Sequence, residues 1–294
     1  EYLFYIIFKL FNNEIYGLEN PCHKMFKELF LTNNVSFKAI SLDEAGIIVE
    51  DLKKYNINIA YVTPSHQFPT GVIMGISRRT ELLNWANENP SRYIVEDDYD
   101  SEFKYTGRPI PALKATDIND KVIYLGSFSK SISPAIRVSY LVLPKTLLNI
   151  YQKKLPYFIC PVPTLNQKIL YKFIKEGYFV KHINKMRTLY KKKREFLVNT
   201  IKTYSSKILD KEIYIQGADA GLHLVIKLDK KINEKEFLKE CLENSLKLYS
   251  LEEYNIEEID NEVSYFLLGY ANLTNKEIEE GIFLLIKILK KYYF

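Results

Sequence analysis

The sequence predicts an α/β protein, with a mostly parallel sheet in a larger N-terminal domain and a smaller α+β domain at the C-terminus. Short apolar runs alternate with amphipathic helical patterns in the first half of the chain, and this alternation is typical of βαβ units. Several of these runs are apolar at consecutive positions, as expected of strands that are covered on both faces. After about residue 145 the strands become fewer and the helices longer.

Each half of the chain has its own series of predicted elements. The first half predicts strands at 14–18, 35–42, 57–62, 93–97, 122–126 and 138–143, with helices at 21–32, 48–55 and 77–89. The second half predicts helices at 163–176, 178–206, 234–244 and from about 275, with strands at 212–216, 221–228, 246–251 and 264–270. We therefore predict a large domain over residues 1–160, and interdomain helices with a small domain over 161–294.

Composition is that of an ordinary globular protein and excludes several classes of function. Hydrophobic residues make up 47% and charged residues 26%, and a net charge of +5 is too small to indicate a nucleic-acid partner without a local basic patch. The three cysteines lie far apart, which suits a cytoplasmic protein, and the four histidines form no metal-binding motif. The apolar N-terminus is short and charged, so we predict neither a signal peptide nor a membrane span.

Three of the predicted strands are followed by clusters of polar and charged residues that could bind a ligand. In open α/β sheets, ligands bind outside the carboxyl ends of the strands. Residues 57–71 run from a strand into a Pro/Gly turn that contains His66. Residues 93–103, YIVEDDYDSEF, run from a strand into five carboxylates, and residues 122–144 run from a strand into a loop of serine, lysine and arginine.

The third of these segments carries the residues that a phosphate group and an aldehyde need. Ser127, Ser129, Lys130 and Arg137 lie within eleven residues. Hydroxyl donors and a bidentate guanidinium suit a phosphate dianion. At the edge of a buried sheet, desolvation can lower the pKa of a lysine and make its amine nucleophilic. This combination predicts a Schiff base between Lys130 and pyridoxal phosphate (PLP).

The acidic segment supplies the partner for the ring of this cofactor. The pyridinium nitrogen of PLP is an electron sink only when protonated, and a carboxylate at the end of a strand stabilises that form. Asp97 meets this need, and Tyr99, two residues on, points to the same side and can donate to the phenolate oxygen of the ring. The other acids, which we expect to be solvated or paired locally, are Glu96, Asp98, Asp100 and Glu102. Taken alone, such a cluster is more often a solvated loop or a Mg²⁺ or Ca²⁺ site, so the prediction depends on all three segments occurring in order.

These segments resemble a known family. The resemblance lies in residues 61–86, 93–113, 122–144, 181–195 and 219–224, and it spans nearly the whole chain. The chain is similar to the aminotransferase-like effector domain of MocR-type regulators of the GntR superfamily, which are PLP-dependent proteins of fold type I. Within that family it is most similar to the GABA-responsive regulators.

The resemblance implies a role for each candidate residue. Lys130 would be the Schiff-base lysine, Asp97 the partner of the pyridinium and Tyr99 the partner of the phenolate oxygen. Ser127 and Arg137 would hold the phosphate, with Ser129 nearby. The family also implies a homodimer, and its members bind DNA through an N-terminal winged helix that this chain does not contain.

Three features depart from the family. The chain starts inside the first helix of the large domain, without the first strand of the family's seven-stranded type of sheet and without its phosphate-binding turn, as in a fragment or a split reading frame. At residues 21–23 the family has Pro-Gly-Tyr, whose tyrosine packs on the cofactor ring. Here His23 takes that place, either stacked on the ring or only starting a helix. The third departure is a loss of arginines.

Two arginines that would grip a carboxylate group in the family are replaced here. Glu253 and Met25 stand in their places, and Arg194 is the last arginine in the chain. We therefore expect that GABA is not the ligand and that Glu253, facing the pocket, favours an amine or a polyamine. We place Glu253, Met25 and His66 at the effector site.

The sequence thus predicts a ligand sensor, in which an amine or amino-acid effector displaces Lys130 from PLP and the small domain moves in response. Two alternatives stay open at this stage. One is a stand-alone PLP-dependent aminotransferase, and the other is a truncated remnant that binds PLP weakly.

Overall fold

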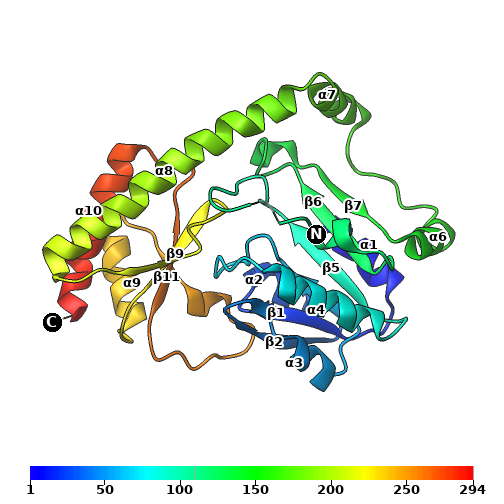
Figure 1. Ribbon diagram of the computed structural model, residues 1–294, viewed down its shortest axis with the longest axis horizontal. Helices are drawn as coiled ribbons and strands as arrows, with labels where there is room; N and C mark the ends of the chain where they lie inside the picture. Colours follow the sequence, from blue (N-terminus) through cyan, green and yellow to red (C-terminus); the bar gives the residue numbers. More distant parts are fainter. Residues whose placement is uncertain (109, 294) are drawn as a thin grey trace.

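The computed structural model describes residues 1–108 and 110–293, which form a larger α/β domain and a smaller α+β domain (Figure 1). The helices of the larger domain are α1 (Tyr2–Leu10), α2 (Lys24–Thr32), α3 (Val49–Lys54), α4 (Ile76–Asn87), α5 (Leu113–Thr116) and α6 (Lys145–Lys154). Its strands are β1 (Tyr16–Asn20), β2 (Phe37–Asp43), β3 (Gly46–Ile47), β4 (Ile59–Val62), β5 (Tyr93–Asp98), β6 (Val122–Ser127) and β7 (Ser139–Val142). A 3-10 turn, η1 (Pro134–Ile136), precedes β7.

The sheet of the larger domain has the predicted, mostly parallel topology. Its strand order is β3-β2-β1-β4-β5-β6-β7, and only the outer strands β3 and β7 run antiparallel to their neighbours. All six strands predicted for this half are present, and β3 is an additional strand of two residues. Within the described residues β7 is an edge strand that pairs only with β6.

Apolar side chains cover both faces of this sheet, as the consecutive apolar positions of the strands predict. On one face α1, α2 and α6 pack over Ile59, Tyr61 and Val95. On the other face α3, α4 and α5 pack over Ala60 and Ile94. Neighbouring residues of β4 and β5 therefore belong to opposite cores, because side chains alternate across a strand.

The C-terminal domain has a separate core. Its strands, β8 (Tyr214–Gln216), β9 (His223–Lys227), β10 (Tyr249–Ser250) and β11 (Tyr265–Gly269), form an antiparallel sheet in the order β10-β11-β9-β8. Helices α9 (Glu234–Glu243) and α10 (Asn275–Tyr293) and the end of α8 (Tyr178–Leu209) pack on it, and η2 (Leu251–Tyr254) follows β10. Figure 1 shows α8 as the long helix that leads from α7 (Thr164–Lys175) to this domain.

The predicted domain boundary at residue 160 falls between α6 and α7. Among the described residues, no helix has the length and apolar character needed to cross a membrane.

The two domains meet through closely packed backbone. Gly71 follows β4 and Gly217 follows β8. If Gly71 carried a Cβ atom, that atom would lie only 2.5 Å from the Cα of Gly217, which is too close for any side chain to fit between them. Gln216 Nε2 also donates to Thr70 O at 2.9 Å. Both glycines have positive φ, of 74° and 73°. The loop after β4, which carries part of the candidate site, is therefore held directly against the C-terminal domain.

We expect the substitution Gly217→Ala to destabilise the protein more than Gly177→Ala. Both residues have positive φ, which costs an alanine about 1–2 kcal/mol. Around Gly177 no atom lies within 4 Å of the added carbon, whereas at Gly217 it meets the backbone of Gly71 at 2.8 Å. Chemical denaturation of the two variants measures the difference. Equal losses of stability would contradict the close contact between the domains.

Candidate functional site

The predicted residues lie around two adjoining cavities at the carboxyl ends of β4, β5 and β6. The first, which we call cavity A, has a volume of about 630 Å³ and is lined by Ser127 and Arg137. The second, cavity B, has a volume of about 450 Å³ and is lined by Lys130. Asp97 and Tyr99 line both cavities. The three segments chosen from the sequence therefore converge on one site.

Alternation along β5 sorts the acidic residues into two groups. Asp97 and Tyr99 point toward the cavities, as predicted. Three of the other acids are buried and are paired locally, which is one of the two alternatives that we expected. Glu96 accepts from the N–H groups of Leu113 and Lys114, Asp98 accepts from the hydroxyls of Tyr124 and Ser101, and Asp100 pairs with His66. Glu102 is half-buried. Asp97 is thus the acid of this cluster that faces both cavities without an ion pair among the described residues.

Asp97 is held by a neighbour that the sequence did not reveal. The hydroxyl of Tyr61 donates to Asp97 Oδ2 at 2.8 Å. Burial raises the pKa of Asp97 to about 6, while the Tyr61 hydrogen bond acts in the opposite direction. A buried carboxylate is costly without a partner, and a positively charged ring nitrogen is such a partner.

The hydroxyl of Tyr99 is engaged by the loop after β4. It donates to His66 O at 2.6 Å and lies 3.3 Å from His66 Nδ1. A hydroxyl has one proton to donate. Donation from Tyr99 to an oxygen of the cofactor therefore requires the hydroxyl to release His66 O.

Cavity A contains the groups expected to bind a phosphate. Ser127 and Arg137 line it, together with Ser139 on β7, which the sequence analysis did not identify. Ser139 Oγ lies 3.4 Å from Ser127 Oγ. Ser129 does not line the cavity, but its backbone N–H donates to Ser127 Oγ at 3.2 Å. Arg137 has φ 49° and ψ 40°, a left-handed conformation that is uncommon for residues other than glycine.

Lys130 lies in the loop that follows β6. It lines cavity B, as its expected role requires, but its side chain is exposed. The desolvation that we expected from a position at the edge of the sheet is therefore not present. The reason is that Lys130 lies three residues beyond the last residue of β6, outside the apolar layers.

Residues at the start of α2 form another wall of cavity B. His23 and Met25 both line it. His23 is the N-cap of α2, where its Nδ1 accepts from the Met25 N–H at 3.2 Å. The histidine ring also lies 5.3 Å from that of Phe68, at an angle of 38°. His23 therefore starts a helix and faces the cavity at the same time, and its stacking on a cofactor ring stays a prediction.

Glu253 does not occupy the place that the sequence analysis gave it. Among the described residues it is absent from the lining of both cavities. Its carboxylate pairs with Lys24 and accepts from the Ser250 N–H at 3.3 Å, which completes a capping box at the start of η2. The inference of a polyamine ligand from a pocket-facing Glu253 is therefore withdrawn.

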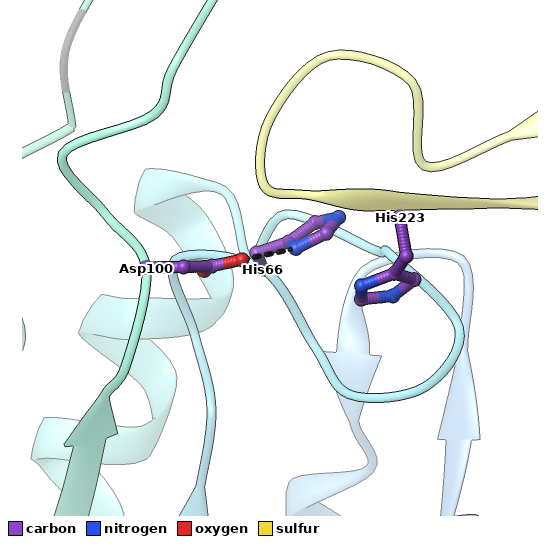
Figure 2. A group of neighbouring side chains, drawn as sticks. All are labelled: His66, Asp100 and His223. Atoms are coloured by element: carbon purple, nitrogen blue, oxygen red, sulfur yellow. Dashed lines mark hydrogen bonds and ion pairs between the residues drawn. The ribbon is translucent and has the colours of Figure 1, made fainter. Parts of the chain in front are cut away.

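His66 belongs to a buried cluster that joins the domains. Figure 2 shows its ring between the carboxylate of Asp100 and the ring of His223, which comes from β9. His66 Nδ1 lies 3.0 Å from Asp100 Oδ2, and the two imidazole rings are 4.5 Å apart. His223 Nε2 lies 3.2 Å from Pro69 O.

This cluster brings together three groups that could ligate a metal ion, with donor atoms within 4.8 Å of one another. The sequence gave no sign of it, because its members come from three distant segments. However, the backbone of Gly221 lies directly beside these donors. A Cβ atom at this position would be 2.1 Å from His66 Nδ1 and 2.5 Å from Asp100 Oδ2. Backbone thus fills the space beside the donors, and the geometry is that of a hydrogen-bonded contact rather than an ion cage.

Taken together, the cavities offer an amine, a buried carboxylate, hydroxyls and a guanidinium in one continuous site, which fits pyridoxal phosphate. Comparison with known proteins agrees. Residues 6–282 match the aminotransferase class I and II family, and the chain belongs to this family. The fold type and the PLP cofactor predicted from the sequence are those of the family.

Curated relatives and solved structures add detail. The chain is 38% identical over 267 residues to the uncharacterized HTH-type transcriptional regulator YdeL of Bacillus subtilis, covering 90% of the chain and 56% of that protein. It is 28% identical to the probable rhizopine catabolism regulatory protein MocR of Rhizobium meliloti, covering 92% and 53%. A multiple substrate aminotransferase of Thermococcus profundus superposes with a TM-score of 0.85 at 26% identity, covering 98% and 72%. The chain thus spans about half the length of the regulators.

A further buried acid, Glu19 at the end of β1, makes stability depend on pH. Burial raises its pKa from 4.5 to about 7, although its Oε2 accepts hydrogen bonds from Thr63 and Gln67. The folded protein therefore binds this proton more tightly than the unfolded chain. Between pH 4.5 and 7, unfolding releases the proton, so the free energy of unfolding falls as the pH rises.

We expect Glu19→Gln to remove this contribution, because glutamine is similar in size and does not ionise. The stability of the variant relative to the wild type should rise from pH 4.5 to 7 and then level off, as measured by urea denaturation of the cofactor-free protein at several pH values. The matched control is Glu44→Gln, at an exposed position. A difference that is constant with pH would contradict the raised pKa of Glu19.

Proposed function

We propose that this chain is the PLP-binding, effector-sensing domain of a MocR-type transcription regulator. The observation that carries the proposal is the convergence of Lys130, Asp97 and Arg137 on one continuous site. The identity of 38% to an HTH-type regulator supports the regulatory class. When bound, pyridoxal phosphate supplies an aldehyde that condenses reversibly with primary amines.

The side chains of the site have distinct tasks in this proposal. Arg137 and Ser127 bind the phosphate, Asp97 stays ionised beside the ring nitrogen, and Lys130 holds the cofactor until the amine of an effector takes its place. His223, on β9, faces the same cavity as Lys130. An effector in cavity B therefore contacts both domains, and differential binding to two arrangements of the domains is what a sensor requires.

We further propose that the regulator is a cytoplasmic homodimer that binds DNA through a winged helix outside this chain. Support for a dimer comes from large apolar side chains exposed on and around α7. They are Tyr157, Ile159, Leu165, Ile169, Tyr171, Ile174, Tyr178 and Val180. An apolar patch of this kind is typical of a surface that packs against another protein. The three cysteines, all free, suit a reducing compartment.

A second candidate is an aminotransferase, favoured by the structural similarity to the Thermococcus enzyme. Incubation of the PLP-loaded protein with an amine separates the two functions. A sensor should show a changed cofactor absorbance that is stable over hours. An enzyme should convert the cofactor to pyridoxamine phosphate, detected by chromatography after denaturation, and that result would contradict the sensor.

We expect Lys130→Ala to abolish covalent attachment of the cofactor. After reduction with borohydride, mass spectrometry should find the cofactor on the peptide that contains Lys130 in the wild type and no covalent cofactor in the variant. The control is Lys207→Ala, an exposed position on α8. Attachment in the Lys130→Ala variant, or failure of the wild type to take up PLP, would contradict the proposed function.

We expect Arg137→Gln to weaken binding of PLP by about 10- to 100-fold, because a charge-assisted contact to phosphate is worth about 1.5–3 kcal/mol. Affinity for pyridoxal, which has no phosphate, should stay within about twofold of the wild type. Fluorescence titration of the cofactor-free protein with both compounds measures the two constants. A parallel loss for pyridoxal would show that Arg137 does not act through the phosphate.

A further inference from the structure

The walls of cavity B are mainly apolar. Five of the residues that line it are Met25, Phe26, Phe68, Leu222 and Leu267. They come from both domains, so an apolar ligand that fills the cavity would be desolvated on several sides. A volume of about 450 Å³ is in the range of small-molecule sites.

The charged groups of cavity B are mostly acidic. Asp97 and Asp100 both line it, and Asp100 Oδ1 is buried with no hydrogen-bond partner among the described residues. The lining includes one lysine, Lys130, and within the described chain no arginine. Lys130 and Asp97 are both reserved for the cofactor, which leaves the carboxylate of Asp100 to face an effector. The balance of charge therefore favours an ammonium group and opposes a second anion.

The two histidines of this lining do not replace the missing cation. Burial lowers the pKa of His23, with a further effect from Lys130. Burial also lowers the pKa of His223 well below its usual value, with a further effect from His66. Both imidazoles are therefore neutral near pH 7.

Cations close to the cavity are engaged elsewhere. Lys24, next to His23, pairs with Glu253 and lies 5.0 Å from the ring centre of Tyr254. Arg187, which is not among the residues that line cavity B, donates to Glu102 O at 2.8 Å. Arg194 is the last arginine of the sequence, so β9 and β11 have none to offer. Among residues 1–108 and 110–293, the lining of cavity B therefore offers no guanidinium to a ligand carboxylate.

We propose that the ligand selected by cavity B is a primary amine with an apolar body and without a carboxylate group. This inference rests on the proposed function and names its effector class. Apolar walls from both domains supply the affinity. The carboxylate of Asp100, and a lining that holds no arginine among the described residues, disfavour amino acids that bear a free carboxylate. Selectivity therefore depends on the lining of cavity B and not on Glu253.

The test compares three amines that differ at one substituent. The PLP-loaded protein is titrated by calorimetry with 2-phenylethylamine, L-phenylalanine and L-phenylalaninamide, which replaces the carboxylate with a neutral group of similar size. We expect phenylethylamine and the amide to bind at least tenfold more tightly than phenylalanine. Equal or tighter binding of phenylalanine would overturn the inference. So would tighter binding of putrescine, a diamine without an aromatic body, than of phenylethylamine.

Two substitutions test the role of the wall. Leu267→Arg and Met25→Arg each add a guanidinium to cavity B, and Met25 is 39% exposed, so its replacement leaves the core unchanged. We expect phenylalanine to gain at least tenfold in affinity relative to phenylethylamine in Met25→Arg and in a folded Leu267→Arg. The control Leu242→Arg, at a position 63% exposed and outside the cavity, should leave the ratio unchanged.

The same experiment separates this inference from the function on which it rests. Uptake of PLP is measured first, by the absorbance of the bound cofactor. A protein that takes up no PLP contradicts the proposed function. A protein that takes up PLP but prefers phenylalanine, or a Met25→Arg variant whose preference is unchanged, contradicts the effector class alone.

Discussion

The site depends on one constraint, the alternation of side chains along β5. Since neighbouring residues of a strand point to opposite faces, a single acidic run supplies both a buried framework and a reactive surface. Glu96 accepts from the N–H of Leu113 at the start of α5, and Asp98 accepts from the hydroxyl of Tyr124 on β6. Asp97 and Tyr99 face the cavities. A shift of register by one residue would exchange the two groups and turn Asp97 and Tyr99 away from the cavities.

The parallel order of the strands is the second requirement. β4, β5 and β6 are adjacent, so their carboxyl ends bring the loop of His66, the acid Asp97 and the loop of Lys130 to one edge. The C-terminal domain closes this edge with His223 and Leu267. The polar groups of the larger domain and the wall that the smaller domain adds to cavity B thus come from different parts of the chain.

Local patterns in the sequence predicted much of this arrangement, and contacts between distant segments account for the rest. Most strands and helices follow from short-range periodicity, although helices α5 and α6 were not predicted. The orientation of Asp97 and Tyr99 follows from their spacing of two. The strand β3 was missed because two residues carry no periodicity. The position of Glu253 was wrong because its partner Lys24 lies 229 residues away. Ser139 and Tyr61 gave no signal, since a serine or tyrosine in a strand is unremarkable until its neighbour is known.

The contact between Gly71 and Gly217 has a consequence for motion. Two main chains that touch without side chains between them cannot be pressed closer, because no rotamer is available to give way. The distance between the two backbones is therefore fixed, so a movement of the C-terminal domain relative to the loop after β4 would have to pivot at this contact.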